Sequence, residues 1–298
     1  MFELDFAFLN MKNQDRTGLA FRKVFLDRLA PLFFGPRVQT LVDFEPLGFK
    51  GCSVLLPLGP ANWNILTPDL QENILQQSQP ILNDYCVSGL GIDRLLKKQL
   101  LQLSTSFPLI FGDNFIKALA FAMIRYYLSC RAFKRLVVVG EMPDMQEFVQ
   151  SLKQFDIPVS IQNYFPGSYE VMAYHMLYEK GIAISTSYLN PRDWEPGDLV
   201  IMVESVYSKY IPLATRPVLV NLTDESRGLA PRLERCLEQR GLAPGMNVMA
   251  PVLESCLLNQ AGSTSASGEE TENIPLWEQM EHLGDHAGMW DYFLDKAE

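Results

Sequence analysis

The chain has 298 residues, of which 48% are hydrophobic and 20% are charged, a balance typical of a soluble globular protein with room for two cores. The net charge of −10 is concentrated near the end of the chain, because residues 269–298 hold nine of the 35 carboxylates and a single lysine. The remainder is nearly neutral and has no basic stripe, so nucleic-acid binding is not predicted.

The start of the chain and its cysteines indicate a cytoplasmic protein. Met1 leads directly into an alternating apolar segment that contains acidic residues, which predicts no secretory signal. The longest apolar stretch, 115–128, is interrupted by Lys117 and Arg125 and is too short to span a bilayer, so we expect a buried helix there and no membrane partner. The five cysteines are scattered without a CxxC pair, as in proteins with reduced thiols.

Strand and helix patterns alternate along the chain, which predicts α/β layers. In the first part the patterns predict, in order, a strand at 2–9, a helix at 15–34, strands at 38–44 and 51–58, a helix at 67–82, and strands at 86–92 and 107–111. In the second part they predict a helix from about 113, then strand 135–140, helix 142–155, strand 158–162, helix 168–181, strands 182–187, 197–204 and 216–222, helix 228–241, and a last strand at 246–253.

Several of these strands are continuous apolar runs, which are typical of a parallel sheet covered on both faces. We therefore predict an N-terminal α/β domain over 1–112 and a Rossmann-like, doubly wound parallel sheet over 113–260. The Gly/Ser/Thr-rich and acidic composition of 261–275 predicts a flexible linker. An acidic amphipathic helix is expected over 276–298.

The terminal helix is predicted to bury one apolar stripe. The stripe comprises Leu276, Met280, Leu283, Ala287, Trp290 and Leu294. Gly284 and Gly288 weaken the helix by roughly 1 kcal/mol each relative to Ala. The stripe is expected to pack on the body of the same chain or, alternatively, to be exchanged in a homodimer.

The stretch GFKGCSVLLPLG, residues 48–59, resembles the substrate-domain motif of the shikimate and quinate dehydrogenases. The order of parts is also similar, with a Gly-Asp-Asn in 111–115 before a connecting helix, and the bacterial acyl-carrier-protein reductases have a related layout. Over about 48–256 the resemblance implies a Rossmann domain that binds NAD or NADP, and a small-molecule ligand in an interdomain cleft.

This sequence departs from that family at the catalytic lysine. The family carries the lysine just after the proline, where this chain has Leu58, Gly59 and Pro60. If proton chemistry is retained, Lys50 and Asp113 are the candidate catalytic residues; the alternative is a surface role for the lysine and a helix-capping role for the aspartate.

The turn after strand 135–140 is the expected cofactor site, because ligands of open parallel sheets bind beyond the carboxyl ends of the strands. Only the first glycine of a GxGxxG loop is present there, and Pro143 removes a backbone donor. The candidate cofactor-binding residues are Gly140, Glu141, Met142, Asn163, Glu204 and Ser205. The alternative is a plain strand-to-helix turn in which Asp144 supports the helix N-terminus.

Other catalytic and metal motifs are weak. His282 and His286 have a spacing that can chelate a metal, but no third ligand is defined, so no metal site is predicted. Three hypotheses for function remain. The first is a dehydrogenase-like protein, the second is a non-catalytic sensor or interaction module descended from one, and the third is an S-adenosylmethionine-dependent methyltransferase, against which Gln162 and Asn163 count.

Overall fold

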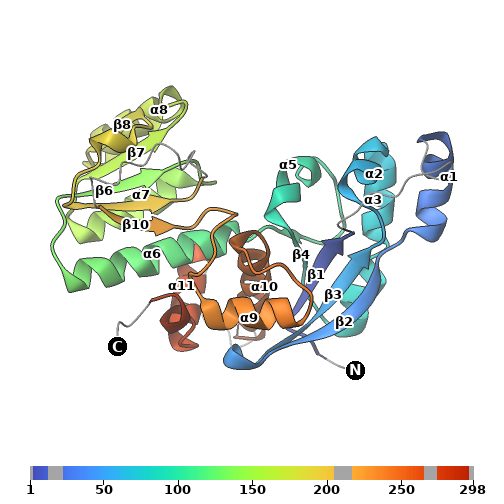
Figure 1. Ribbon diagram of the computed structural model, residues 1–298. Coiled ribbons are helices and arrows are strands. Elements are labelled where there is room, and N and C mark those ends of the chain that lie inside the picture. Colours follow the sequence, from blue (N-terminus) through green and yellow to red (C-terminus); the bar gives the residue numbers. More distant parts are fainter. Residues whose placement is uncertain (1–2, 13–22, 205–216, 265–273, 295–298) are drawn as a thin grey trace. The chain divides into compact units, whose positions relative to one another are not determined.

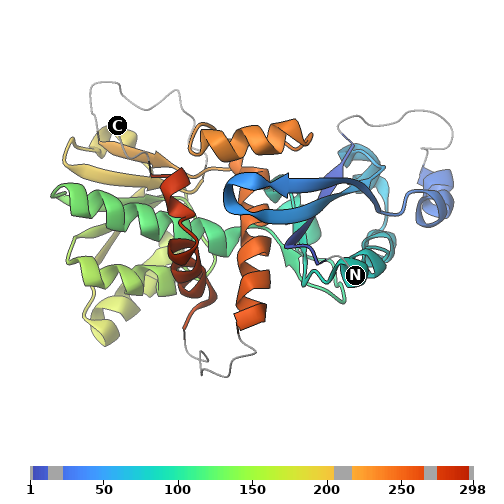
Figure 2. The ribbon, with the colours of Figure 1, turned by 90° about the horizontal axis from the view of Figure 1, so that it is seen from below.

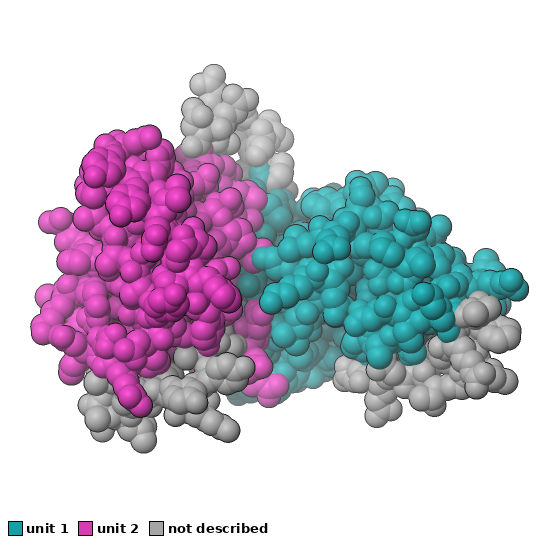
Figure 3. All heavy atoms as spheres, turned by 90° about the horizontal axis from the view of Figure 1, so that it is seen from above, with its two compact units in different colours: residues 1–112, 230–271 teal, residues 113–229, 272–298 magenta. Residues whose placement is uncertain are grey.

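The computed structural model describes residues 3–12, 23–204, 217–264 and 274–294, and the chain forms two compact units (Figure 3). The first unit combines Met1–Gly112 with Ala230–Thr271, and the second combines Asp113–Leu229 with Glu272–Glu298. Among the helices of these described ranges, none has the length and apolarity needed to cross a membrane.

Residues 230–260 belong to the first unit, whereas the sequence predicted that they belong to the Rossmann-like domain. The reason is α10 (Met246–Thr264), a helix where the sequence predicted a last strand at 246–253. Its residues 246–257 are all buried, and it packs on strands of the first unit. A helix that is buried on every side lacks a clear amphipathic period, and a short, mostly apolar run then resembles a buried strand. The same helix also covers 261–264, which we had assigned to the flexible linker.

The sheet of the first unit has the order β2-β3-β1-β4-β5, with β2 antiparallel to β3 and the other pairs parallel (Figure 1). The core lies between this sheet and the helices of the unit, and Trp63 and Ile74 are completely buried in it. The elements are β1 (Phe6–Met11), α1 (Lys23–Phe33), β2 (Arg37–Phe44), β3 (Phe49–Leu56), α2 (Pro60–Ile65), α3 (Pro68–Gln76), α4 (Gln79–Tyr85), β4 (Leu90–Ile92), α5 (Lys97–Leu100), β5 (Leu109–Ile110), α9 (Pro231–Gln239) and α10.

The second unit is a Rossmann-like sheet of five parallel strands in the order β10-β9-β6-β7-β8. Numbered from its first strand this order is 5-4-1-2-3, which is the arrangement of a doubly wound fold. The predicted fold class is therefore confirmed for this unit. Its elements are α6 (Asp113–Cys130), β6 (Arg135–Val139), α7 (Met145–Leu152), β7 (Val159–Asn163), α8 (Gly167–Lys180), β8 (Ile184–Tyr188), β9 (Asp198–Met202), β10 (Val218–Asn221) and α11 (Leu276–His286).

The C-terminal helix is shorter than predicted, and its buried face agrees with the predicted stripe only in part. α11 ends at His286, and a short 3-10 turn follows at Trp290–Tyr292. Its buried residues are Trp277, Met280, Glu281 and Gly284, whereas Leu276 of the predicted stripe is exposed. Met280 and Trp290 of the predicted stripe are buried. The ring of Trp290 lies against Gly284, where a Cβ would be 2.3 Å from that ring.

α11 packs on α6 of the same unit, so it lies on the body of its own chain (Figure 2). Trp277 contacts Phe121 of α6 and Phe148 of α7 at ring-centroid distances of 5.4 and 5.5 Å. Arg125 of α6 forms ion pairs with Glu281 at 2.9 Å and with Asp285 at 3.1 Å. Exchange of this helix between two copies stays an untested alternative.

Candidate functional site

The carboxyl ends of β6 and β9 meet at the switch in strand order of the second unit. The chain runs outward from β6 through β7 to β8, then returns to β9 on the other side of β6. Such a switch is where open α/β sheets bind ligands. Gly140 and Glu204 follow these two strands and lie in close contact, because a Cβ on Gly140 would be 2.4 Å from the Cβ of Glu204. Gly140 also has φ +103°, a conformation that L-residues rarely adopt.

Asn163 ends the neighbouring strand β7 and points toward the turn after β6. Its Nδ2 donates to Oε1 of Glu141 at 3.4 Å and approaches Oγ of Ser168 at 3.5 Å. The side chain is only 1% exposed, yet its Oδ1 accepts no hydrogen bond from the described residues. Turning the amide over would bring Oδ1 against the carboxylate of Glu141, so the present orientation is favoured.

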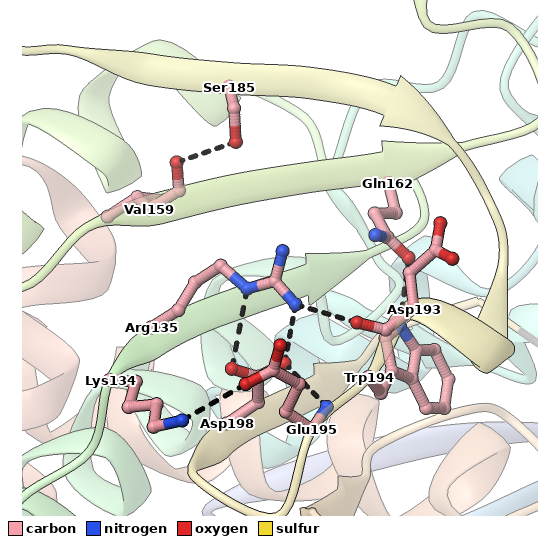
Figure 4. A network of polar contacts seen from close by, with 9 residues as sticks. All are labelled: Lys134, Arg135, Val159, Gln162, Ser185, Asp193, Trp194, Glu195 and Asp198. Carbon is pink, nitrogen blue, oxygen red and sulfur yellow. Dashed lines mark hydrogen bonds and ion pairs between the residues drawn. The ribbon is translucent and has the colours of Figure 1, made fainter.

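The side chain of Gln162, the preceding residue, is hydrogen-bonded within the core of the second unit. Its Oε1 accepts from the indole Nε1 of Trp194 at 2.9 Å, as Figure 4 shows. Trp194 is buried among apolar residues of β6 and β9. Gln162 therefore has a structural role, and of the two polar residues that end β7 only Asn163 faces the candidate site.

An ion pair between Arg135 and Asp198 joins the amino-terminal ends of β6 and β9, at the side of the sheet opposite the switch in strand order (Figure 4). Arg135 also donates to the backbone oxygen of Asp193 at 3.0 Å, which secures the segment between β8 and β9. Asp198 is buried, and its hydrogen bond raises the pKa of the Arg135 guanidinium. This network holds the central strands in register, so that the switch end is supported from the amino-terminal side of the sheet.

Tyr169 at the start of α8 covers the turn after β6. The backbone N–H of Met142 donates to its phenolic oxygen. Burial and, to a smaller extent, the carboxylates of Glu141 and Glu204 raise the pKa of Tyr169 to about 12. Tyr169 is therefore protonated at neutral pH, and its O–H can donate a hydrogen bond.

Lys117 approaches the same turn from α6. Its side chain is 2% exposed, and its Nζ lies 3.2 Å from Oδ2 of Asp144, which is 65% exposed. Asp144 adopts a left-handed conformation and precedes the first residue of α7. The buried ammonium thus supports the turn through Asp144, and the turn keeps its shape without the second and third glycines of a phosphate loop.

We call the residues around this end of the sheet the switch-point site. It comprises Gly140, Glu141, Met142, Asn163, Tyr169 and Glu204. Five of the six predicted cofactor-binding residues lie in it, and the sixth, Ser205, lies outside the described residues. Whether these residues bind a cofactor remains a prediction. The sequence analysis missed Tyr169 and Lys117, although a lone lysine within the apolar run 115–124 was a usable signal.

The two candidate catalytic residues lie in different units. Lys50 is exposed near the start of β3, and its backbone N–H donates to Oδ2 of Asp5 at 2.7 Å. It is therefore at the amino end of its strand, away from the carboxyl edge where ligands of such sheets bind. Asp113 is the first residue of α6, in the acidic first turn that the helix dipole favours. Their catalytic roles stay untested predictions.

The described residues contain no group of three or more His, Cys, Asp and Glu side chains placed to hold a metal ion. His282 and His286 are both exposed on α11. Cys52 and Cys256 are buried in the first unit as free thiols, and burial raises the pKa of Cys52 to about 12.

Comparison with known proteins gives a likeness of layout. No protein-family model and no curated protein matches the sequence. L-tryptophan dehydrogenase from Nostoc punctiforme aligns with a TM-score of 0.44 and 12% identity, over 97% of this chain and 80% of that one. Shikimate 5-dehydrogenase from Thermus thermophilus, in complex with NADP(H) and shikimate, aligns with a TM-score of 0.36 and 16% identity, over 96% and 100%.

A second shikimate dehydrogenase, in complex with NADP+, aligns with a TM-score of 0.37 and 10% identity, over 86% of this chain and 98% of that one. All three TM-scores are below 0.5, so the agreement is weak. It assigns neither a ligand nor a reaction to this chain.

Proposed function

We propose that the second unit is a Rossmann-like ligand-binding module whose switch-point site binds a small molecule through that molecule's hydroxyl or amino donors. The observation that carries the proposal is the buried Oδ1 of Asn163, which accepts no hydrogen bond from the described residues. A buried acceptor left in that state costs about 1–3 kcal/mol. A donor from a ligand, or from a water in its absence, removes this cost.

The charges around Asn163 favour the same class of ligand. Glu141 and Glu204 both act on Tyr169 and raise its pKa, so their carboxylates face a common region. Carboxylate and amide oxygens accept hydrogen bonds and attract cations. A ribose diol, an amine or a sulfonium complements this arrangement, and Tyr169 offers one donor in addition.

The residues do not fit the diphosphate of NAD or NADP in the usual way. A phosphate-binding turn presents free backbone N–H groups and tolerates close approach. Here the N–H of Met142 already donates to Tyr169, Pro143 has no N–H, and Glu141 adds negative charge. The buried cation at the turn, Lys117, faces Asp144. We therefore derive no hydride-transfer step, and the non-catalytic module is the function that the site supports best.

Calorimetric titration with nucleosides and dinucleotides tests this proposal. The probes are adenosine, S-adenosylmethionine, and the oxidised and reduced forms of NAD and NADP. We expect saturable binding of adenosine or S-adenosylmethionine, and weaker binding or none for the four dinucleotides. NADP(H), named in two of the aligned structures, is the first dinucleotide to titrate.

Two matched variants connect the binding to the site. Asn163→Leu removes the buried acceptor. Because this loses a buried hydrogen bond, we expect binding to weaken by about tenfold or more. Asn221→Ser changes an asparagine that ends β10, the edge strand of the same sheet, and is expected to leave binding unchanged. Binding of NADP(H) that is tighter than that of adenosine and insensitive to Asn163→Leu would favour a dehydrogenase. Failure of every probe to bind would also contradict the proposal.

A further inference from the structure

The apolar surface on α8 and β8 is independent of the switch-point site and carries a second inference. α8 buries only Met176 among its 14 residues, although its sequence is rich in apolar and aromatic side chains. The exposed members of this surface, which we call the α8/β8 face, are Val171, Tyr174, Leu177, Tyr178 and Tyr188.

These residues form one continuous surface. The helical rotation of 100° per residue places Leu177, Tyr174, Tyr178 and Val171 in sequence around about one third of the helix circumference. A cavity of about 300 Å³ lies between α8 and β8, lined by Tyr174 and Leu177 of the helix and by Ile184 and Thr186 of the strand. Because strand residues alternate between faces, Tyr188 points to the same side as Ile184 and Thr186.

β8 ends the sheet of the second unit and has one neighbour, β7, among the described strands (Figure 1). The N–H of Leu189 donates to the oxygen of Asn163 on β7. Backbone groups alternate in direction along a strand, so the N–H and C=O groups of Ile184, Thr186 and Tyr188 point away from β7. The strand has no proline and no charged residue, the devices by which exposed edges are usually protected from pairing.

We propose that the occupant of this face is a second copy of the chain, joined by antiparallel pairing of β8 with β8 about a two-fold axis at Thr186. Thr186 pairs with itself in this register, because its N–H and C=O groups both point outward. Ile184 then pairs with Tyr188 of the second copy, whose ring covers the cavity between α8 and β8. The two five-stranded sheets become one continuous sheet, with the two α8 helices side by side on one face.

The size of the surface agrees with a dimer interface. A standard interface buries about 800 Å² per partner, of which a little over half, or roughly 450 Å², is apolar. Tyr174, Tyr178 and Tyr188 are 62%, 80% and 72% exposed. At about 150–250 Å² for a whole aromatic side chain, these three alone offer roughly 300–500 Å².

Symmetry and charge also agree with two copies. A two-fold axis makes the two α8 helices antiparallel, so the N-terminal turn of one lies toward the C-terminal turn of the other. α8 carries Glu170 in its first turn, and both Lys180 and Glu179 in its last, the latter paired with His175 at 2.8 Å. Opposite ends of the helix dipoles therefore face each other across the axis, and Lys180 of one copy lies toward the end of α8 that carries Glu170 in the other.

Sedimentation velocity over a concentration series, together with two variants and a control, tests the proposal. Thr186→Pro removes an outward N–H and is compatible with the edge strand, so it should leave the fold intact and give a monomer. Tyr178→Glu should raise the dimer dissociation constant by ~30-fold or more, as for a central aromatic residue of an interface. Phe33→Ser, at an aromatic residue of the first unit that is 69% exposed, should leave the dimer intact.

Hydrogen exchange gives a second measurement, which reports on the edge of β8 itself. The amides of Ile184 and Tyr188 should be protected in the wild-type dimer and exchange rapidly in Thr186→Pro, while the circular dichroism of both proteins stays the same. A wild-type protein that is monomeric at its highest soluble concentration would overturn the proposal. A dimer that persists in both variants, or that dissociates equally in Phe33→Ser, would overturn it as well.

Discussion

The ammonium of Lys117 lies 3.2 Å from the carboxylate of Asp144, and the two groups differ in exposure: the lysine side chain is 2% exposed and the aspartate side chain 65%. A buried charge depends on its partner, whereas an exposed charge retains its hydration when the partner is removed. The two halves of this ion pair should therefore contribute unequally to stability.

We expect Asp144→Asn to destabilise the protein by about 1–3 kcal/mol, because it leaves the Lys117 ammonium buried without a counter-charge. Asparagine tolerates the left-handed conformation of this position, so the loss reports the charge and not the backbone. Lys117→Met should be nearly neutral, since it fills the same space and leaves an exposed carboxylate. Urea unfolding of both variants and of the double variant measures the asymmetry. Equal losses in the two single variants would contradict it.

Gly140→Ala should be more damaging than an alanine substitution at another left-handed glycine. A Cβ on Gly140 would meet Glu204 at 2.4 Å, and φ is +103°, so we expect a loss of about 2–4 kcal/mol. Gly181 ends α8 with φ +66° and has open space around its would-be Cβ, so Gly181→Ala should lose only about 1–2 kcal/mol. The difference in unfolding free energy isolates the close approach of β6 and β9. No difference between the two variants would show that this contact is loose in solution.

The pKa of Tyr169, about 12, gives the protein a specific response to alkali. The ordinary value is 10.0, so the folded state keeps the phenol protonated over a range in which the unfolded state loses the proton. The stability linked to this group is complete below pH 10 and is lost as the pH rises from about 10 to about 12.

Tyrosinate absorbance measures the pKa of Tyr169 directly. The signal is the difference between the titration of the wild type and that of Tyr169→Phe. The midpoint of the difference should lie near 12, and Glu204→Gln should lower it by removing one carboxylate. Glu195→Gln, at the opposite end of β9, should leave it unchanged. A difference titration centred at the ordinary value would mean that Tyr169 does not cover the turn.

The parts of the fold that could be predicted from the sequence are those with an unambiguous period or a strong local signal. The β6–α7 turn is an example, because Gly140 follows a run of apolar residues and Pro143 and Asp144 cannot continue a strand. α10 could not be predicted in the same way, since residues 246–257 are mostly apolar, are buried on all sides and contain Pro251. Its identity as a helix depends on burial against β1 and β4, which are distant in the sequence.

The position of the candidate site at the carboxyl edge of the sheet could be predicted from topology, whereas the side chains around it depend on contacts between elements. Asn163 and Glu204 were expected at the carboxyl edge because they end parallel strands. The roles of Tyr169 and Lys117 depend on contacts between elements, namely Met142 with α8 and Asp144 with α6, and no local pattern encodes these contacts. Gln162 precedes Asn163 in the sequence, and the direction of its side chain follows from the position of Trp194.

Trp277 provides the test of how the C-terminal helix is oriented. The sequence pattern placed Leu276 on the buried stripe, whereas the structure buries Trp277 against Phe121 and Phe148 and leaves Leu276 40% exposed. Trp277→Ala should therefore cost about 3–5 kcal/mol, the range for a buried large aromatic side chain, and Leu276→Ala less than about 1 kcal/mol. Chemical denaturation followed by circular dichroism compares the two variants. If Leu276→Ala were the more damaging, α11 would pack through the face that the sequence pattern predicted, and the ion pairs of Arg125 with Glu281 and Asp285 would have to be abandoned with it.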